Sequence, residues 1–265
     1  MQIIADTHVH IYAHYQRARL LDAAAAAFAG HEDRLGSLAD TRLLFLTETQ
    51  RDDVWGDWLA GAPPASGSEW TFAAAPEQGA GLLTHPHHGV LTVLAGRQIV
   101  TTERLEVLAL TCTERIPDGR PVREVIAAVR ATGAIATLSW SPGKWWGRRG
   151  RLVAELLTEY EPGQVVIGDV LLRPGCWPEP LLMRTARRRG FMVLAGSDPL
   201  PLPNEEQWAG AYGIEARINY DPSHPVTSIR RWLSQVNSQP NVVGARNNTT
   251  TFVHRIWAMH RRKHA

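Results

Sequence analysis

Cysteine is scarce in this sequence, and long apolar runs are missing from it. Cys112 and Cys176 are the two cysteines in 265 residues, too few for a disulfide framework and without the spacing of a zinc knuckle. We therefore expect free thiols in a reducing compartment. The longest apolar run, around 23–29, is far shorter than the roughly 20 residues of a membrane helix, and no secretory signal precedes it. These features predict a cytoplasmic protein without a membrane partner.

An excess of charge of one sign is missing as well. Lys and Arg number 28 against 26 Asp and Glu, which gives a formal net charge of +2 and no electrostatic argument for a nucleic-acid partner. The hydrophobic fraction of 44% is ordinary for a globular protein. Because 265 residues fit one large α/β barrel, we expect residues 1–265 to form a single domain, and the sequence leaves its oligomeric state open.

Short apolar segments alternate with amphipathic ones along most of the chain. An apolar strand at 2–5 precedes a helical segment at 15–29, and the same order returns from about residue 121 onward. This alternation is typical of a largely parallel α/β sheet or barrel. Between residues 70 and 110, several strand-like segments follow one another with short connections, which predicts some antiparallel pairing there.

The first strand ends in Asp6-Thr7-His8-Val9-His10. Side chains two residues apart on a strand share a face, so His8 and His10 are expected to point together into the mouth of a barrel, where active sites of that architecture lie. Neutral imidazoles bind zinc, manganese or iron, and Asp6 is placed to orient one ring. The alternative is a pair of structural histidines.

Three further acids follow apolar strands. Asp198, in Gly196-Ser197-Asp198, comes after the strand FMVLA and is suited to bind a metal or to accept a proton from water during catalysis. Its alternative role is a turn residue, since Asp-Pro often begins a turn. Glu48 and Asp169 end two other strands, where each is a candidate metal ligand or a loop cap.

A basic, glycine-containing loop spans residues 141–150. Backbone N–H groups and cationic side chains in such a loop suit an anionic substrate group, although an exposed loop over packed tryptophans explains the same composition. The candidate substrate-binding residues are Lys144, Arg148, Arg149 and, after another strand, Arg173.

A second histidine cluster, Thr84-His85-Pro86-His87-His88, lies between two expected strands. A hairpin tip is the simplest location for it. Whether these histidines bind a metal stays open at this point.

The succession of motifs resembles the PHP (polymerase and histidinol phosphatase) family of metal-dependent phosphoesterases over residues 1–212. The segment Asp6 to His10 matches the family's opening motif, and Gly196-Ser197-Asp198 matches the start of its late Gly-Ser-Asp-Ala-His motif. The resemblance implies a distorted (β/α)7 TIM-like barrel, with residues 213–265 as a C-terminal helical extension. It also implies that His8, His10 and Asp198 are metal ligands.

Several ligand positions of the family are replaced in this chain. Glu48 stands in the family's Thr-Asp-His motif, and Asp169 stands where a glutamate is usual. A tryptophan that points into the site would fill the space of a metal. The replaced positions are Thr49, Gln98, Trp140 and Leu200. A reduced site, with one divalent ion (Zn, Mn or Fe) or none, is therefore expected.

The resemblance implies a divergent metal-dependent hydrolase that acts on a small phosphorylated substrate. Asp198 would serve both as ligand and as catalytic group. The alternative is a catalytically inactive PHP-like barrel that binds an anionic ligand or a protein partner, and the replaced ligand positions favour it.

Overall fold

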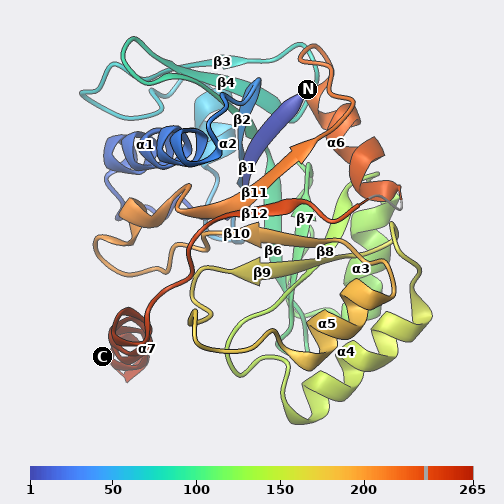
Figure 1. Ribbon diagram of the computed structural model, residues 1–265. Coiled ribbons are helices and arrows are strands. Elements are labelled where there is room, and N and C mark those ends of the chain that lie inside the picture. The colour runs from blue at the N-terminus through green and yellow to red at the C-terminus, as the bar shows by residue number, and fades with distance from the viewer. Residues whose placement is uncertain (236–237, 265) are drawn as a thin grey trace.

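The computed structural model describes residues 1–235 and 238–264, and its strands form two sheets (Figure 1). A seven-stranded sheet has the order β12-β11-β1-β2-β5-β4-β3, and a five-stranded sheet has the order β10-β9-β8-β7-β6. The strands are β1 (Gln2–Val9), β2 (Thr41–Leu46), β3 (Thr71–Ala74), β4 (Ala80–His85), β5 (Gly89–Leu94), β6 (Gly96–Val100), β7 (Glu106–Leu110), β8 (Ile135–Ser139), β9 (Val166–Val170), β10 (Val193–Gly196), β11 (Tyr212–Arg217) and β12 (Asn241–Gly244). The helices are α1 (Arg17–Leu35), α2 (Val54–Leu59), α3 (Val122–Ala131), α4 (Gly147–Glu159), α5 (Leu181–Arg188), α6 (Pro225–Ser234), α7 (Thr249–His264) and the 3-10 helix η1 (Glu205–Trp208).

Strand β1 lies in the interior of the larger sheet. It pairs in parallel with β2 and antiparallel with β11, and every residue after Gln2 is buried. Burial on both faces explains why its start, Ile3-Ile4-Ala5, is continuously apolar rather than alternating. The polar residues that follow, from Asp6 onward, are therefore buried groups that need partners.

The antiparallel pairing expected between residues 70 and 110 is confirmed. Strand β4 pairs antiparallel with both β3 and β5, and β6 pairs antiparallel with β7. Strand β5 then joins the larger sheet in parallel with β2. The segment from β3 to β5 is thus a three-stranded extension of the larger sheet.

The expected (β/α)7 barrel is wrong, because the described strands form two sheets and no closed barrel. The neighbours of the first two strands explain why no barrel closes. Strand β1 is paired with β2 and β11, and β2 is paired with β1 and β5, so each has a strand of the larger sheet on both sides. Residues 213–265, expected to be a helical extension, also supply β12 and most of β11 to the larger sheet. Residues 236, 237 and 265 of that segment lie outside the described part of the chain.

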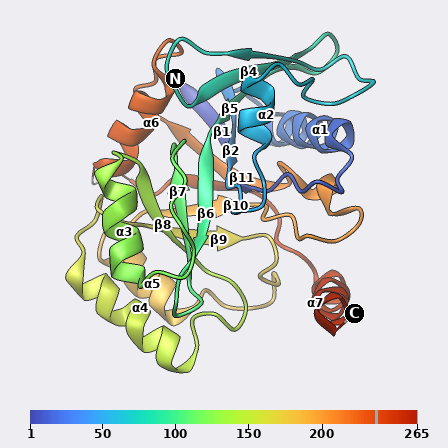
Figure 2. The same cartoon turned by 180° about the vertical axis from the view of Figure 1, so that it is seen from behind.

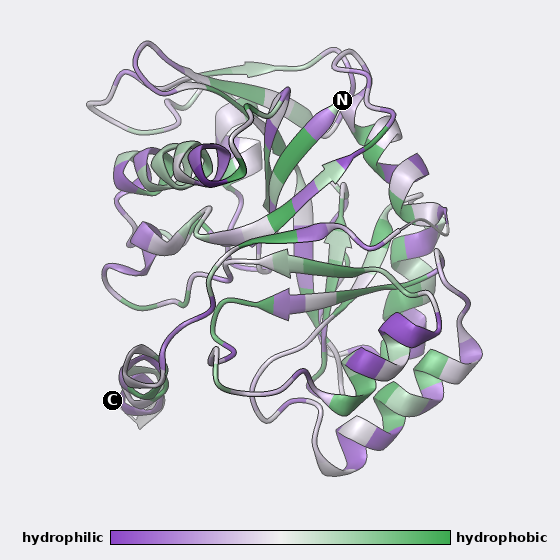
Figure 3. Ribbon diagram, in the orientation of Figure 1, coloured by the Kyte–Doolittle hydropathy of each residue, from purple (hydrophilic) through white to green (hydrophobic). Residues whose placement is uncertain are grey.

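The two sheets pack on each other and are covered by helices on their outer faces (Figures 1 and 2). Ile3 and Phe45 of the larger sheet share a buried cluster with Leu108 and Leu194 of the smaller one. Helices α1 and α2 cover the larger sheet, and α3, α4 and α5 cover the smaller sheet. Hydrophobic residues accordingly concentrate on the interior strands (Figure 3). No helix of the described residues is long and apolar enough to cross a bilayer.

The sheets also meet through backbone hydrogen bonds at two places. The N–H of Asp198, just after β10, donates to the carbonyl of His8 on β1 at 2.8 Å, and the N–H of Gln98 on β6 donates to the carbonyl of Glu48 after β2 at 2.8 Å. These contacts bring together the ends of strands from both sheets. The chemistry-bearing residues lie at this junction.

Candidate metal centre

His8 and His10 project from β1 toward the same point, as their spacing predicted. Each residue is 2% exposed, and their Nε2 atoms lie 3.0 Å apart. The His10 ring stacks on Tyr12, with ring centroids 5.2 Å apart, which restricts its orientation. Two nitrogens that converge in this way can bind one ion between them.

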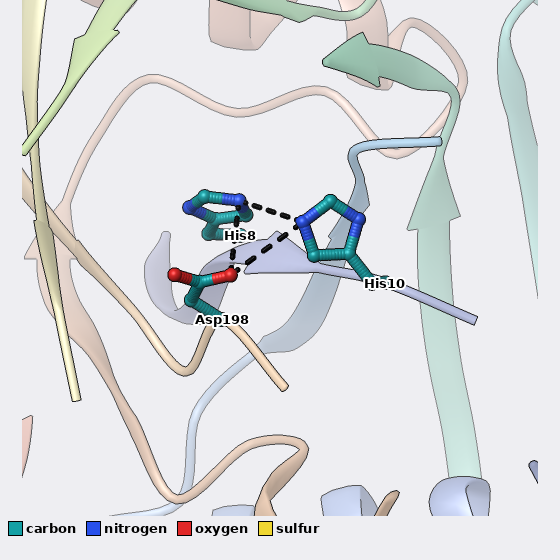
Figure 4. Close-up of side chains that lie close together, drawn as sticks. All are labelled: His8, His10 and Asp198. Atoms are coloured by element: carbon teal, nitrogen blue, oxygen red, sulfur yellow. Dashed lines mark hydrogen bonds and ion pairs between the residues drawn. The ribbon is translucent and has the colours of Figure 1, made fainter. Parts of the chain in front are cut away.

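Asp198 completes the group from the turn after β10 (Figure 4). Its Oδ1 lies 3.5 Å from the Nε2 of His8 and 3.5 Å from the Nε2 of His10. The backbone of Asp198 has φ +47, a left-handed conformation that aspartate tolerates better than most residues. Backbone strain of this kind persists where the surroundings hold it in place, and here it directs the carboxylate toward the two rings.

The distances within this group fit a metal ion. Ligands of a tetrahedral zinc ion, bound at 2.0–2.1 Å, lie about 3.3 Å from one another, and the observed separations of 3.0 and 3.5 Å bracket that value. Among the described residues, His8, His10 and Asp198 form a group whose ligand atoms all lie within 4.8 Å of one another. Two nitrogens and one oxygen are a donor set suited to zinc, iron or manganese.

Burial keeps both histidines in the form that binds metals. Desolvation lowers the pKa of His8 to about 3 and that of His10 to about 3. The positive charge of Lys144 lowers the pKa of His8 further. Both imidazoles are therefore neutral at pH 7, and a neutral ring offers a lone pair to a metal ion.

Gln98 of β6 supplies a fourth polar atom. Its Oε1 lies 3.2 Å from the Nε2 of His8. An amide oxygen is neutral, so it adds a dipole but no charge where the resembled family has a bridging glutamate. The formal charge of the four groups is thus a single negative charge, from Asp198, which favours one divalent ion over several.

Asp6 does not orient a histidine ring, contrary to expectation. Its carboxylate accepts backbone N–H groups from Ser197 and Gly210, both at 2.8 Å, and from His8 at 3.2 Å. The Nδ1 atoms of His8 and His10 are buried without a hydrogen-bond partner among the described residues. Asp6 therefore binds backbone groups, and its hydrogen bonds connect β1 to the turn that carries Asp198.

Burial raises the pKa of Asp6 to about 6, and the hydrogen bonds from Ser197, Gly210 and His8 oppose that rise. The carboxylate is consequently the main form at pH 7. An ionised carboxylate that accepts several N–H groups is a strong connection between segments. The Ser197 side chain adds an O–H donor at 2.5 Å.

The two remaining carboxylates that we considered as ligands have other partners. Glu48 pairs with Arg97, at 2.8 Å, and accepts the N–H of Trp55 at the start of α2. Asp169 forms a buried ion pair with Arg173 and accepts the hydroxyl of Tyr212 at 2.9 Å. Neither belongs to the group of His8, His10 and Asp198.

The basic residues that we predicted to bind substrate are dispersed. Lys144 pairs with Glu106, and its charge reaches His8. Arg149 donates to the carbonyl of Gly143 at 2.8 Å, Arg148 is exposed, and Arg173 is held by Asp169. Lys144 is the member of this set whose charge lowers the pKa of a histidine in the group of His8, His10 and Asp198.

Of the positions at which family ligands are replaced, Gln98 lies beside His8, whereas the other three have different surroundings. Trp140 is 2% exposed and packs in the apolar cluster beneath α3, α4 and α5, as does Leu200. Thr49 donates its hydroxyl to Asp52 at 2.5 Å. A Trp140 side chain that pointed into the site would fill the space of a metal; in the structure its indole packs in this apolar cluster.

A pocket of about 220 Å³ adjoins the centre through Gln98. Its lining includes the cations Arg97 and Arg115. Arg97 is buried and paired with Glu48 and Asp53, whereas Arg115 is about half exposed and pairs with Asp53 at 2.9 Å. Neither arginine is predicted by a sequence motif. Arg97 could have been found because it is adjacent to Gln98, whereas nothing in the sequence around Arg115 indicates a binding role.

Comparisons with known proteins bear on the fold only. No protein-family model matches the chain, and no curated protein matches its sequence. The crystal structure of PsfC from Pseudomonas syringae PB-5123 is similar over 99% of this chain and 98% of that chain, with 16% identity and a TM-score of 0.52. This similarity shows a shared fold.

The lesion-specific endonuclease PfuEndoQ from Pyrococcus furiosus aligns with 91% of this chain and 58% of its own, at 12% identity and a TM-score of 0.45. That likeness is too slight to support an inference. The resemblance to the PHP family stays a prediction based on two motifs.

Proposed function

We propose that this chain is a metal-dependent hydrolase with a single-ion centre, and that its substrate is a small phosphoester. The observation that carries the proposal is the convergence of the His8 and His10 Nε2 atoms with the Asp198 Oδ1 at separations of 3.0 to 3.5 Å. Buried, neutral imidazoles beside a carboxylate are a costly arrangement for stability alone, and they are common at functional sites.

The chemistry that a divalent ion supplies at such a centre is Lewis acidity toward a phosphoryl oxygen and activation of water. His8 and His10, each 2% exposed, hold the inner side of the centre. The Asp198 side chain is 13% exposed, so it is the group of the three that faces solvent. We assign to it the second role of accepting a proton from the attacking water.

The substrate anion is assigned to the pocket that Gln98 shares with Arg97 and Arg115. Arg97 is held by Glu48 and Asp53, which fix its guanidinium beside the pocket but balance its charge, so the cation left to bind an anion is Arg115. Among the described residues, Arg115 is bound to exposed partners, the carbonyl of Gln50 and the carboxylate of Asp53. It can exchange them for a phosphate, which guanidinium groups bind through paired N–H donors.

A non-catalytic binding protein is the second candidate. Two observations favour it: Gln98 stands in the place of a carboxylate, and the Nδ1 atoms of His8 and His10 have no partner in the part of the chain that the structure describes. Ligating histidines usually donate their other N–H to an acceptor. Such a protein would use the same arginine-lined pocket for an anion without turnover.

Metal content and activity distinguish the two candidates. The full-length protein is stripped with chelator, incubated with zinc or manganese, and analysed for bound metal and for hydrolysis of p-nitrophenyl phosphate. We expect metal-dependent turnover that is lost in His10→Ala and retained in His14→Ala, a control at an exposed histidine of the same segment. Metal binding that is lost in His10→Ala but accompanied by no turnover on any phosphoester would support the binding protein. Bound metal that is absent, or that is unchanged in His10→Ala, would contradict both the ion at this centre and the hydrolase.

A further inference from the structure

A second group of metal-ligating side chains lies away from the site described above. Asp22 of α1 and the residues His85 and His88, at the turn between β4 and β5, offer ligand atoms within 4.8 Å of one another. The three residues are half-buried. Two imidazoles and a carboxylate that approach from separate segments are a suitable donor set for a transition-metal ion.

Trp70 connects the three side chains and restricts their rotation. Its indole N–H donates to the Asp22 Oδ1 at 2.8 Å. The His88 ring stacks on the indole with an interplanar angle of 6°, and the centroid of the His85 ring is 5.0 Å from it. The indole therefore serves as the outer support that orients ligands in many metal sites.

The turn itself is fastened to α1. Arg42 donates to the carbonyl of His88 at 3.3 Å and to Glu32 of α1 at 3.0 Å. His85 pairs with Gly89 across the turn, and Gly89 has φ +76, a left-handed conformation that suits glycine. The backbone that carries both histidines is thus held close to Asp22 before any ion binds, which reduces the ordering cost of binding.

We propose that Asp22, His85 and His88 form a second, surface metal site for a transition-metal ion such as zinc, copper or nickel. The partial exposure of His88 (35%) and Asp22 (49%) leaves coordination positions to water. An ion there links residue 22 to residues 85–88, so it joins the β4–β5 turn to α1 and stabilises the folded chain by mass action. This site shares no residue with the group of His8, His10 and Asp198, so the proposal does not depend on the hydrolase proposed above.

Copper titration of the chelator-stripped, full-length protein tests the site, with bound metal and tryptophan fluorescence as readouts. A bound copper ion quenches the neighbouring Trp70 indole, so we expect a quenching phase that is absent in Trp70→Phe. In His88→Ala the phase is expected to shift to at least about tenfold higher copper. His87→Ala, an exposed histidine of the same turn, is the matched control and is expected to leave the phase unchanged.

Two further variants keep the test decisive. Asp22→Asn can still accept the Trp70 N–H but lacks the negative charge, so it is expected to weaken copper binding while circular dichroism stays unchanged. His8→Ala is expected to retain the Trp70 phase, which separates this site from the centre at β1. Equal effects of His87→Ala and His88→Ala, or an unchanged phase in the double variant His85→Ala/His88→Ala, would overturn the proposal.

Discussion

The backbone of Gly196 lies directly against His8. A Cβ at position 196 would be 2.5 Å from the Cβ of His8 and 2.6 Å from its amide nitrogen, closer than non-bonded atoms approach. The absence of a side chain at this position lets the end of β10 reach β1. That approach places Asp198, two residues later, beside the histidine rings.

Replacement of Gly196 by alanine is therefore expected to damage both stability and metal binding. The added methyl must displace β1 or the turn, an overpacking change that destabilises by about 1–3 kcal/mol or more. Gly175→Ala is the control, because a Cβ there meets its nearest atoms at 3.8 Å and the residue is exposed. Urea denaturation and zinc titration measure the two effects, and a Gly196→Ala protein that matches the Gly175→Ala protein in both would contradict this packing argument.

Asp6→Asn tests the connection between β1 and the turn. The side chain keeps its size but loses the charge that accepts N–H groups from Ser197, Gly210 and His8. The amide NH2 of asparagine replaces an acceptor oxygen and faces these donors, and a buried donor left without an acceptor costs about 1–3 kcal/mol, so we expect the free energy of unfolding to fall by about that amount. Zinc affinity is expected to fall with it, because Asp198 follows Ser197.

Asp118→Asn is the matched control for this variant. Asp118 also accepts a backbone N–H, from Val100 at 2.8 Å, but it does so at the exposed surface. We expect a change below about 1 kcal/mol for that substitution. Equal losses in the two variants, measured by urea denaturation, would mean that burial of Asp6 adds nothing.

The proximity of His8, His10 and Asp198 could be predicted from the sequence, whereas their surroundings could not. The spacing of His8 and His10 follows from the two-residue period of a strand, and Asp198 ends an apolar strand. The role of Asp6 was misjudged because its partners, the N–H groups of Ser197 and Gly210, are backbone groups about two hundred residues away. No local pattern reveals them.

The arrangement of the strands was predictable only in part. The alternation of strands and helices indicated an α/β fold, and short connections indicated the antiparallel pairs. The barrel was wrong because β5 pairs with β2, and β11 pairs with β1. Both pairings join strands distant in the sequence, and local periodicity carries no information about such neighbours.

The stability of the metal-free protein is expected to depend on the protonation of His8 and His10. An unfolded histidine titrates near 6.5, whereas burial lowers the pKa of each of these residues to about 3. Between those values the unfolded chain binds more protons, so the free energy of unfolding decreases as the pH falls from about 6.5 toward 3. The pKa of Asp6 is raised from 3.8 to about 6, so between those pH values the folded chain holds this proton more tightly than the unfolded chain. Asp6 therefore opposes the decrease in stability over that range.

Urea denaturation in the presence of chelator, at pH 7 and at pH 4.5, measures that dependence. The double variant His8→Gln/His10→Gln removes both titrating groups, so we expect it to lose less stability on acidification than the unmodified protein, by on the order of a few kcal/mol. His87→Gln, at an exposed position, is the control. A pH dependence unchanged by the double variant would contradict the neutral, buried state of the two rings.

Arg115→Ala tests the assignment of the substrate pocket. Because Arg115 lines the pocket next to Gln98 and pairs at the surface with Asp53, its removal is expected to raise KM for a phosphoester about tenfold, with little change in kcat or in stability. Arg120→Ala, which removes a surface arginine paired with Glu124, is expected to leave KM unchanged. Steady-state kinetics over a range of ionic strength distinguish a local contact from a general loss of positive charge.

Gln98→Glu tests whether the centre is limited by its charge. The Oε1 of Gln98 lies 3.2 Å from the Nε2 of His8, so a carboxylate there adds a second negative charge to the three-residue group without a change in size. We expect the affinity for zinc or manganese to rise at least about tenfold, because an added anionic ligand attracts a divalent ion strongly in a partly buried site. Gln50→Glu adds the same charge to the same pocket, so it controls for the effect of a negative charge on the electrostatic potential of the whole pocket. Calorimetric titration compares the two variants: a rise confined to Gln98→Glu supports an ion bound beside residue 98, and equal rises would place the attraction in the pocket as a whole.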